Sequence, residues 1–260
     1  MLQFLPHFPG PTFTVMAFPK GVKHFTLPWR LQAVNYGLHV VWRGRRTVKP
    51  TIPKTVAHRL PLYLRRLESF DADGVETVSS RDLARSLGLK DAQVRKDLAY
   101  FGTFGRPGVG YPVRELIPKL RAILGTNRRW RLALVGFGNL GRALISYRGF
   151  RRKAFKIEAV FDADLAKIGH RAGDLVVQDI GDLVTQVRRL QIPLAILALP
   201  AEAAQAAADE LIRAGVVGIL NFAPITLNVP ADVAVINVDL TVCLEELAFR
   251  VNLARTAASG

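Results

Sequence analysis

Two patterns of hydrophobic and polar residues divide the chain. Between residues 54 and 124, apolar residues recur at intervals of three and four, as in Leu60, Leu64 and Leu67, which predicts amphipathic helices. From residue 132 onward, short apolar runs without polar alternation take turns with helical patterns. Such runs indicate parallel strands covered by helices on both faces. The chain is therefore predicted to have a helical domain followed by an α/β domain.

The helical region contains a predicted helix-turn-helix. Ser79 opens a helix that ends at Gly88, and Asp91 caps the next helix, whose inward side chains are expected to be Val94, Leu98 and Phe101. The second helix of such a pair enters the major groove of DNA. The side chains predicted to contact DNA from these helices are Ser80, Gln93, Arg95, Lys96 and Tyr100.

A glycine-rich stretch from Gly102 to Tyr111 predicts a hairpin that carries Arg106. Such a hairpin makes the domain a winged helix, with Arg106 on the phosphate backbone or in the minor groove. The alternative is that Arg95, Lys96 and Arg106 are ordinary solvated charges. Pro61 is expected near the first turn of its helix, and Pro118 is expected to kink the following helix or shift its start.

The run Leu132 to Val135 leads into a glycine turn and a helix, the order of a dinucleotide-binding motif. The residues predicted to hold the pyrophosphate are Gly136, Phe137, Gly138, Asn139, Leu140 and Gly141. A second apolar run ends in Asp162, where a carboxylate accepts from ribose hydroxyls and repels a 2′-phosphate. NAD(H) is therefore favoured over NADP(H), and the alternative is a purely structural turn.

Further strands and helices are predicted as far as Val238. Pro200, Asn221 and Phe222 follow two of these strands, at the sheet edge where ligands bind. The alternative is that Pro200 and Pro224 have no role in binding and only interrupt the chain in the loops that follow these strands. The last helix carries one apolar stripe, formed by Leu244, Leu247, Ala248 and Val251. Such a stripe favours a contact between two subunits, and the alternative is that the helix covers the core of its own chain.

Charge is distributed unevenly in this chain of 260 residues with a formal charge of +15. Residues 1–67 contain eleven Lys and Arg and no acid, so most of the basic excess lies in the N-terminal third. Residues 1–52 are interpreted as a disordered extension, with a DNA-touching basic arm as the alternative. The single cysteine, Cys243, fits the reducing cytoplasm. We expect no membrane segment, and one cysteine and five scattered histidines give no zinc spacing.

With these motifs placed, the chain resembles the Rex family of redox-sensing transcriptional repressors over about residues 54–256. The segments that carry the resemblance are SSRDLARSLGLKDAQVRKDLAYFG, GRPGVGY, ILGTNRRW, LVGFGNLGRAL, GILNFAPITLNVP and VINVDL. The resemblance implies a homodimer that binds double-stranded operator DNA, exchanges its terminal helices and releases DNA when NADH replaces NAD⁺. Composition, motifs and resemblance together predict four regions: a disordered extension (1–52), which the resemblance leaves unmatched, a winged helix (53–125), a Rossmann NAD(H)-binding domain (126–240) and a dimerisation helix (241–260).

The resemblance further implies an interdomain switch made by Arg65, Tyr147 and Asp239, the last two also near the cofactor. We hypothesise that Asp239 pairs with Arg65 in the DNA-binding state and with Tyr147 in the closed state. The alternative is that Asp239 only caps the terminal helix. The family can place an aromatic residue after this aspartate, whereas this chain has Leu240.

Two other functions compete with the repressor. A NAD-dependent dehydrogenase needs a general acid, but His170 is expected in a loop and Tyr147 has Arg151 instead of Lys four residues on. A module for another adenine nucleotide, such as coenzyme A, is disfavoured by Asp162, whose carboxylate suits free ribose hydroxyls.

Overall fold

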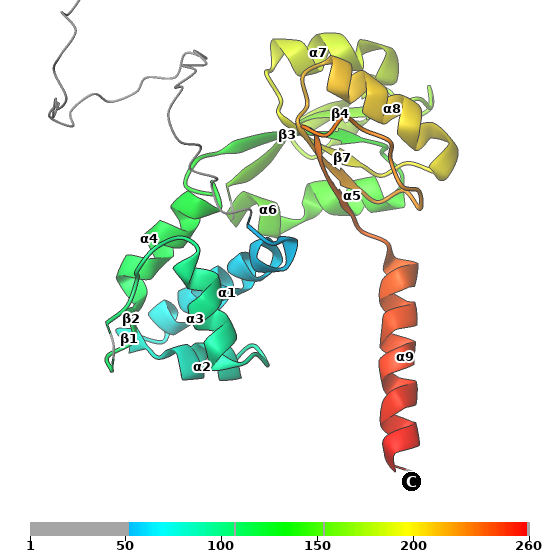
Figure 1. The fold of residues 1–260 in the computed structure, drawn as a ribbon. Helices are drawn as coiled ribbons and strands as arrows, with labels where there is room; N and C mark the ends of the chain where they lie inside the picture. The colour runs from blue at the N-terminus through cyan, green and yellow to red at the C-terminus, as the bar shows by residue number, and fades with distance from the viewer. Residues whose placement is uncertain (1–51, 107, 153, 259–260) are drawn as a thin grey trace, which may run out of the picture. The chain divides into compact units, whose positions relative to one another are not determined.

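A computed structural model describes residues 52–106, 108–152 and 154–258 (Figure 1). The extension predicted for residues 1–52 lies outside the described residues except for Ile52. The elements of the N-terminal part are α1 (Lys54–Ala72), β1 (Thr77–Val78), α2 (Ser80–Arg85), α3 (Asp91–Ala99), β2 (Tyr111–Pro112) and α4 (Val113–Ile123).

The C-terminal part is built of strands and helices. They are β3 (Trp130–Val135), α5 (Asn139–Ser146), α6 (Arg148–Arg152), β4 (Phe155–Asp162), β5 (Arg171–Ala172), β6 (Leu175–Asp179), a 3-10 turn η1 (Ile180–Asp182), α7 (Leu183–Arg189), β7 (Leu194–Leu197), α8 (Ala201–Arg213), β8 (Gly218–Asn221), β9 (Ala234–Asn237) and α9 (Leu240–Ala258). The short elements α6 and β5 have no counterpart in the sequence prediction.

The N-terminal part is a winged helix, as predicted. Its helices share one buried core, which includes Leu60, Tyr63, Leu67, Val78, Leu83, Val94, Leu98, Leu116 and Leu120. Strands β1 and β2 pair antiparallel. Between α3 and β2 the chain forms the predicted hairpin, where Arg106 and Gly110 exchange two backbone hydrogen bonds of 3.1 Å. The helix-turn-helix α2–α3 and this wing therefore belong to one packed unit.

The prediction that Pro61 lies near a first turn was wrong, and the start of α4 is not shifted by Pro118. Pro61 lies well inside α1, and Pro118 lies inside α4 without shifting its start from Val113. Both prolines are exposed. A carbonyl that loses its amide partner on the solvent side of a helix can bind water instead, which lowers the cost of an interior proline.

The two helix starts differ in their capping. The Ser79 hydroxyl accepts from the Asp82 amide at 3.1 Å and donates to the Asp82 carboxylate at 2.6 Å, so the predicted cap of α2 is confirmed. Asp91 is not the cap of α3. It is the first helical residue, after Lys90, and its carboxylate accepts from the Ala92 amide at 2.8 Å. The carboxylate still lies at the positive end of the helix, where it is stabilising.

The C-terminal part has a seven-stranded sheet in the order β5-β6-β4-β3-β7-β8-β9. All neighbours pair in parallel except β5 and β6. Without the short strand β5, this is the doubly wound Rossmann order, in which the direction of winding changes between β3 and β7. The predicted fold class is therefore confirmed, and the ligand-binding edge is the one where these two strands end.

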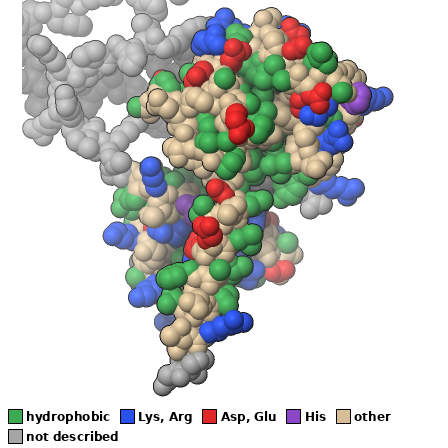
Figure 2. Space-filling model, turned by 90° about the vertical axis from the view of Figure 1, so that its right-hand side faces the viewer, with side chains coloured by type: hydrophobic (Ala, Val, Ile, Leu, Met, Phe, Trp, Pro, Cys, Tyr) green, Lys and Arg blue, Asp and Glu red, His purple; other side chains and the backbone are tan. Residues whose placement is uncertain are grey.

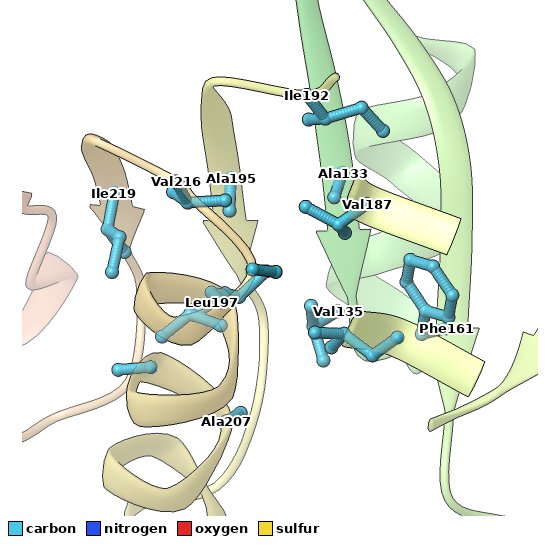
Figure 3. Packing of buried hydrophobic residues seen from close by; sticks show 14 of the residues in the cluster. Ala133, Val135, Phe161, Val187, Ile192, Ala195, Leu197, Ala207, Val216 and Ile219 are labelled. Atoms are coloured by element: carbon cyan, nitrogen blue, oxygen red, sulfur yellow. The ribbon is translucent and has the colours of Figure 1, made fainter. Parts of the chain in front are cut away.

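Helices cover both faces of this sheet, with α7 and α8 on one side and α5 on the other (Figure 1). Successive side chains of β3 point to opposite faces of the sheet. Ala133 and Val135 face α7 and α8, and Leu134 belongs to the core on the α5 side. Figure 3 shows the first core, where strand side chains such as Phe161 pack with Val187 of α7. Burial on both faces explains the uninterrupted apolar runs.

Helix α9 is apolar on two opposite sides and exposed along its described length. One side carries Leu240, Leu244, Leu247 and Val251, and the other carries Val242, Phe249 and Leu253. The second stripe was absent from the sequence prediction. Figure 2 shows apolar side chains along this helix, beside its acidic and basic ones. Two apolar sides need two covering surfaces.

None of the helices in the described part of the chain combines the length and apolar character of a transmembrane span.

Candidate functional site

The glycine turn after β3 forms an open cradle at the start of α5. Gly136 has φ +99°, and a Cβ there would lie 2.3 Å from the carbonyl oxygen of Ala198, which follows β7. A Cβ on Gly141 would lie 2.1 Å from the carbonyl oxygen of Gly136. Around Gly138, by contrast, nothing lies within 4 Å of such a Cβ. Two glycines therefore allow close packing, and the third leaves free space beside the amides of a helix N-terminus, which suits phosphate.

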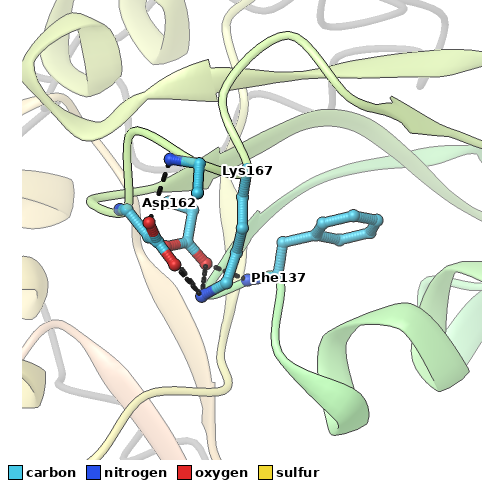
Figure 4. A network of polar contacts seen from close by, with 5 residues as sticks. Phe137, Asp162 and Lys167 are labelled. Atoms are coloured by element: carbon cyan, nitrogen blue, oxygen red, sulfur yellow. Dashed lines mark hydrogen bonds and ion pairs between the residues drawn. The ribbon is translucent and has the colours of Figure 1, made fainter.

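Asp162 ends β4 next to this turn and is only 7% exposed. Its carboxylate accepts from the Phe137 amide at 2.7 Å and from the Asp164 amide at 2.9 Å, and it pairs with Lys167 at 3.3 Å (Figure 4). Burial acts to raise the pKa of Asp162, but these hydrogen bonds and the Lys167 charge outweigh it and hold the pKa below its ordinary value. Asp162 is therefore an anion tied to the glycine turn.

The other predicted cofactor residues lie at the same edge of the sheet. Pro200 precedes α8, and Phe222 follows β8, where its amide donates to Leu197 at 2.9 Å. The Asn221 side chain is fully buried and holds the loop after β8, with bonds that include one of 2.9 Å to the Ile225 carbonyl. Asn139 and Leu140 begin α5. Their contacts with a nucleotide stay predictions.

Tyr147 and Asp239 follow the ends of α5 and β9. Tyr147 is 56% exposed, and its ring packs edge-on against Phe150 at 5.1 Å. The Oδ1 atom of Asp239 accepts from the Thr241 amide at 2.8 Å and the Val242 amide at 3.2 Å, so Asp239 does cap α9. No hydrogen bond within the described residues reaches its Oδ2 atom. The predicted pairing with Arg65, which is exposed on α1, stays a prediction.

On the DNA-binding side, the structure brings Arg95 and Ser80 together. The Arg95 guanidinium donates to the Ser80 hydroxyl at 3.0 Å and to the Asp91 carboxylate at 2.6 Å. A cleft of about 600 Å³ between α3 and the wing is lined by Ser80, Arg95 and Arg106 among others. Lys96 is exposed and Tyr100 half-buried, and neither lines this cleft. Arg95 is thus held at the mouth of a cleft between recognition helix and wing.

Gln93 is half-buried and faces a polar cluster that sequence reasoning missed. Its amide nitrogen donates to Asp97 at 2.6 Å. Asp97 is fully buried and also accepts from Arg59 at 2.6 and 2.9 Å and from the Tyr63 hydroxyl at 2.6 Å. Burial acts to raise the pKa of Asp97, but these donors hold it below its ordinary value. The cluster joins α1 to the recognition helix α3.

In the described residues, no group of His, Cys, Asp or Glu side chains is arranged to hold a metal ion.

Known proteins match both parts of the chain. A family profile described as "Putative DNA-binding protein N-terminus" matches residues 51–99, and one described as "CoA binding domain" matches residues 127–225. The redox-sensing transcriptional repressor Rex of Carboxydothermus hydrogenoformans is 51% identical over 200 residues, which cover 77% of this chain and 96% of the relative. This chain belongs to the Rex family.

Solved structures support the same assignment. The Rex-family repressor RSP, in complex with NAD⁺ and operator DNA, is 36% identical, with a TM-score of 0.75 over 80% of this chain and 96% of RSP. The RSP complex with NADH is 35% identical, with a TM-score of 0.74 over 80% and 98% of the two chains. Because the similar proteins are transcriptional repressors, the dehydrogenase alternative is rejected. The CoA-binding profile covers only the Rossmann part of a chain whose Rex relatives match both parts.

Proposed function

We propose that this Rex-family chain binds operator DNA as a homodimer when NADH is scarce and releases the DNA when NADH binds. The observation that carries this proposal is the free space around Gly138, at the sheet edge of a chain whose other domain is a winged helix. The site would hold NAD⁺ and NADH with the amides of the glycine turn and α5. We place the chain in the cytoplasm, with its DNA.

Discrimination between the two nucleotides has to occur at the nicotinamide ring, where they differ by one positive charge. An apolar closed site favours the neutral ring, because a cation is costly to desolvate. We assign the response to Asp239, Tyr147 and Arg65. The Asp239 cap and this role are compatible, because Oδ1 caps α9 and Oδ2 accepts no hydrogen bond within the described part of the chain. A movement of Asp239 would therefore shift the start of α9, which its Oδ1 atom caps.

A nearly complete switch between two states needs a difference in binding of about 5 kcal/mol. Two linked nucleotide sites supply this difference in binding free energy more readily than one site. Dimerisation therefore has a role in sensing. The two apolar sides of α9 support a dimer in which each terminal helix is enclosed by its partner. The whole proposal is tested by following operator binding while the two nucleotides are titrated.

Arg95→Ala is expected to weaken operator binding about tenfold or more, since a specific base contact contributes roughly 1–3 kcal/mol. NADH affinity should not change. Both are measured by titration at one salt concentration, because phosphate contacts make affinity fall with salt. The matched control is Arg213→Ala, which removes a similar helical Arg–Glu pair from α8. Equal operator affinity in the two variants would remove Arg95 from the DNA interface.

Leu247→Glu or Phe249→Glu is expected to convert the dimer into monomers, because each places an unpaired carboxylate in an enclosed apolar contact. Sedimentation velocity measures the change. Asn252→Glu adds the same charge on the side of α9 between the two stripes and should leave the dimer intact. A dimer that survives both apolar substitutions would show that α9 is not the subunit contact.

A further inference from the structure

Lys167 lies in the loop after β4 and faces two carboxylates of the candidate ribose site. Its ammonium nitrogen is 3.3 Å from each oxygen of Asp162 and 3.3 Å from the Oδ2 atom of Asp164 (Figure 4). The side chain is only 29% exposed. A lysine so placed is a constituent of the site and not a solvated surface charge.

The ion pairs of Lys167 with Asp162 and Asp164 determine the net charge of this group. Burial acts to lower the pKa of Lys167, but its contacts with Asp164 and Asp162 outweigh burial and raise it, so the ammonium stays charged. Asp162 has a lowered pKa and stays ionised. The group of two carboxylates and one ammonium therefore carries one negative charge instead of two. The repulsion that a 2′-phosphate meets there is therefore weaker than the two carboxylates would cause without Lys167.

We propose that Lys167 sets the selectivity of this site between dinucleotides with and without a 2′-phosphate on the adenosine ribose. The proposal rests on the proposed function, because it requires that the ribose lie at Asp162. A ribose diol donates to Asp162 and needs no cation. A 2′-phosphate gains from the Lys167 ammonium and is repelled by both carboxylates. Lys167 therefore maintains a weak but measurable affinity for NADPH and contributes little to the affinity for NADH.

The test is the Lys167→Met variant of the full chain, which keeps most of the side-chain length and removes the charge. Dissociation constants for NADH and NADPH are measured by calorimetry at fixed salt. We expect the affinity for NADPH to fall about tenfold or more and that for NADH to change by less than about threefold, since opposite charges a few ångströms apart interact by this order of energy in a partly exposed site. Lys167→Arg, which keeps the charge, should retain most of the NADPH affinity.

The matched control is Lys156→Met, at the other end of β4, where the lysine is 65% exposed and pairs with Glu158. It should change neither affinity. Equal losses for NADH and NADPH in Lys167→Met, or an unchanged ratio of the two constants, would overturn the proposal and leave the proposed function intact. Failure of the unmodified chain to bind NADH would refute the proposed function itself, and this inference with it.

Discussion

Gly138→Val is expected to abolish the response of operator binding to NADH while the fold stays stable. Gly138 has φ −78° and ψ −163°, which valine adopts readily, and nothing lies within 4 Å of an added Cβ. The valine side chain would instead fill the space in which the α5 amides meet a phosphate. We expect NADH affinity to fall roughly 100-fold, which corresponds to about 2.7 kcal/mol. Calorimetric titration measures the loss, and thermal unfolding tests the fold.

Gly141→Ala provides the contrast. Its Cβ would lie 2.1 Å from the Gly136 carbonyl oxygen, so α5 has to move away from the glycine turn. This variant should lose NADH affinity together with thermal stability, whereas Gly138→Val should lose affinity alone. Full NADH affinity in Gly138→Val would mean that the nucleotide does not lie over this turn.

Asp97→Ala is expected to destabilise the winged helix by about 3–5 kcal/mol, the usual result of removing one partner from a buried ion pair. Asp97 is fully buried and accepts from Arg59, Tyr63 and Gln93. Its loss leaves a guanidinium, a phenol hydroxyl and an amide without their acceptor. Operator binding should be lost with the fold of this domain, whereas NADH binding to the Rossmann part should persist. Urea unfolding followed by circular dichroism measures the stability.

The pH dependence of the same domain follows from the lowered pKa of Asp97. A carboxyl group whose pKa is lower in the folded than in the unfolded state stabilises the fold at neutral pH, and this stabilisation is lost as the pH falls from about 3.9 through the folded pKa. Asp97→Asn should reduce this loss of stability at acid pH. Asp71→Ala breaks the exposed pair with Arg114 and should cost less than about 1 kcal/mol. A similar cost for Asp71→Ala and Asp97→Ala would contradict the role of the buried cluster.

Local signals predicted most elements of the candidate nucleotide site. The strand, glycine turn, helix and terminal carboxylate between Leu132 and Asp162 are specified by neighbours in sequence, and each lies where it was expected. Lys167 was passed over because its partners are known only once the loop after β4 folds back on the strand. The spacing of Asp164 and Lys167, three residues apart, gave a hint of their pairing but not of the contact with Asp162.

The DNA-binding side was less predictable for a related reason. Asp97 lies between Val94 and Leu98 on the inward face of α3, so the helical period already indicated a buried carboxylate that needs donors. Its donors come from α1, and only the tertiary structure identifies Arg59 and Tyr63. Pro61 was misjudged because the rule against interior prolines does not consider which side of the helix faces solvent.

The central claim is that NADH selects the form of the protein that does not bind DNA. The most direct test is the anisotropy of a fluorescent duplex, selected by the chain from random-sequence DNA, at fixed salt with NADH or NAD⁺ added. The account predicts that NADH releases the duplex, that NAD⁺ at the same concentration does not, and that excess NAD⁺ raises the NADH needed for release. Equal release by both nucleotides, or by neither, would contradict it.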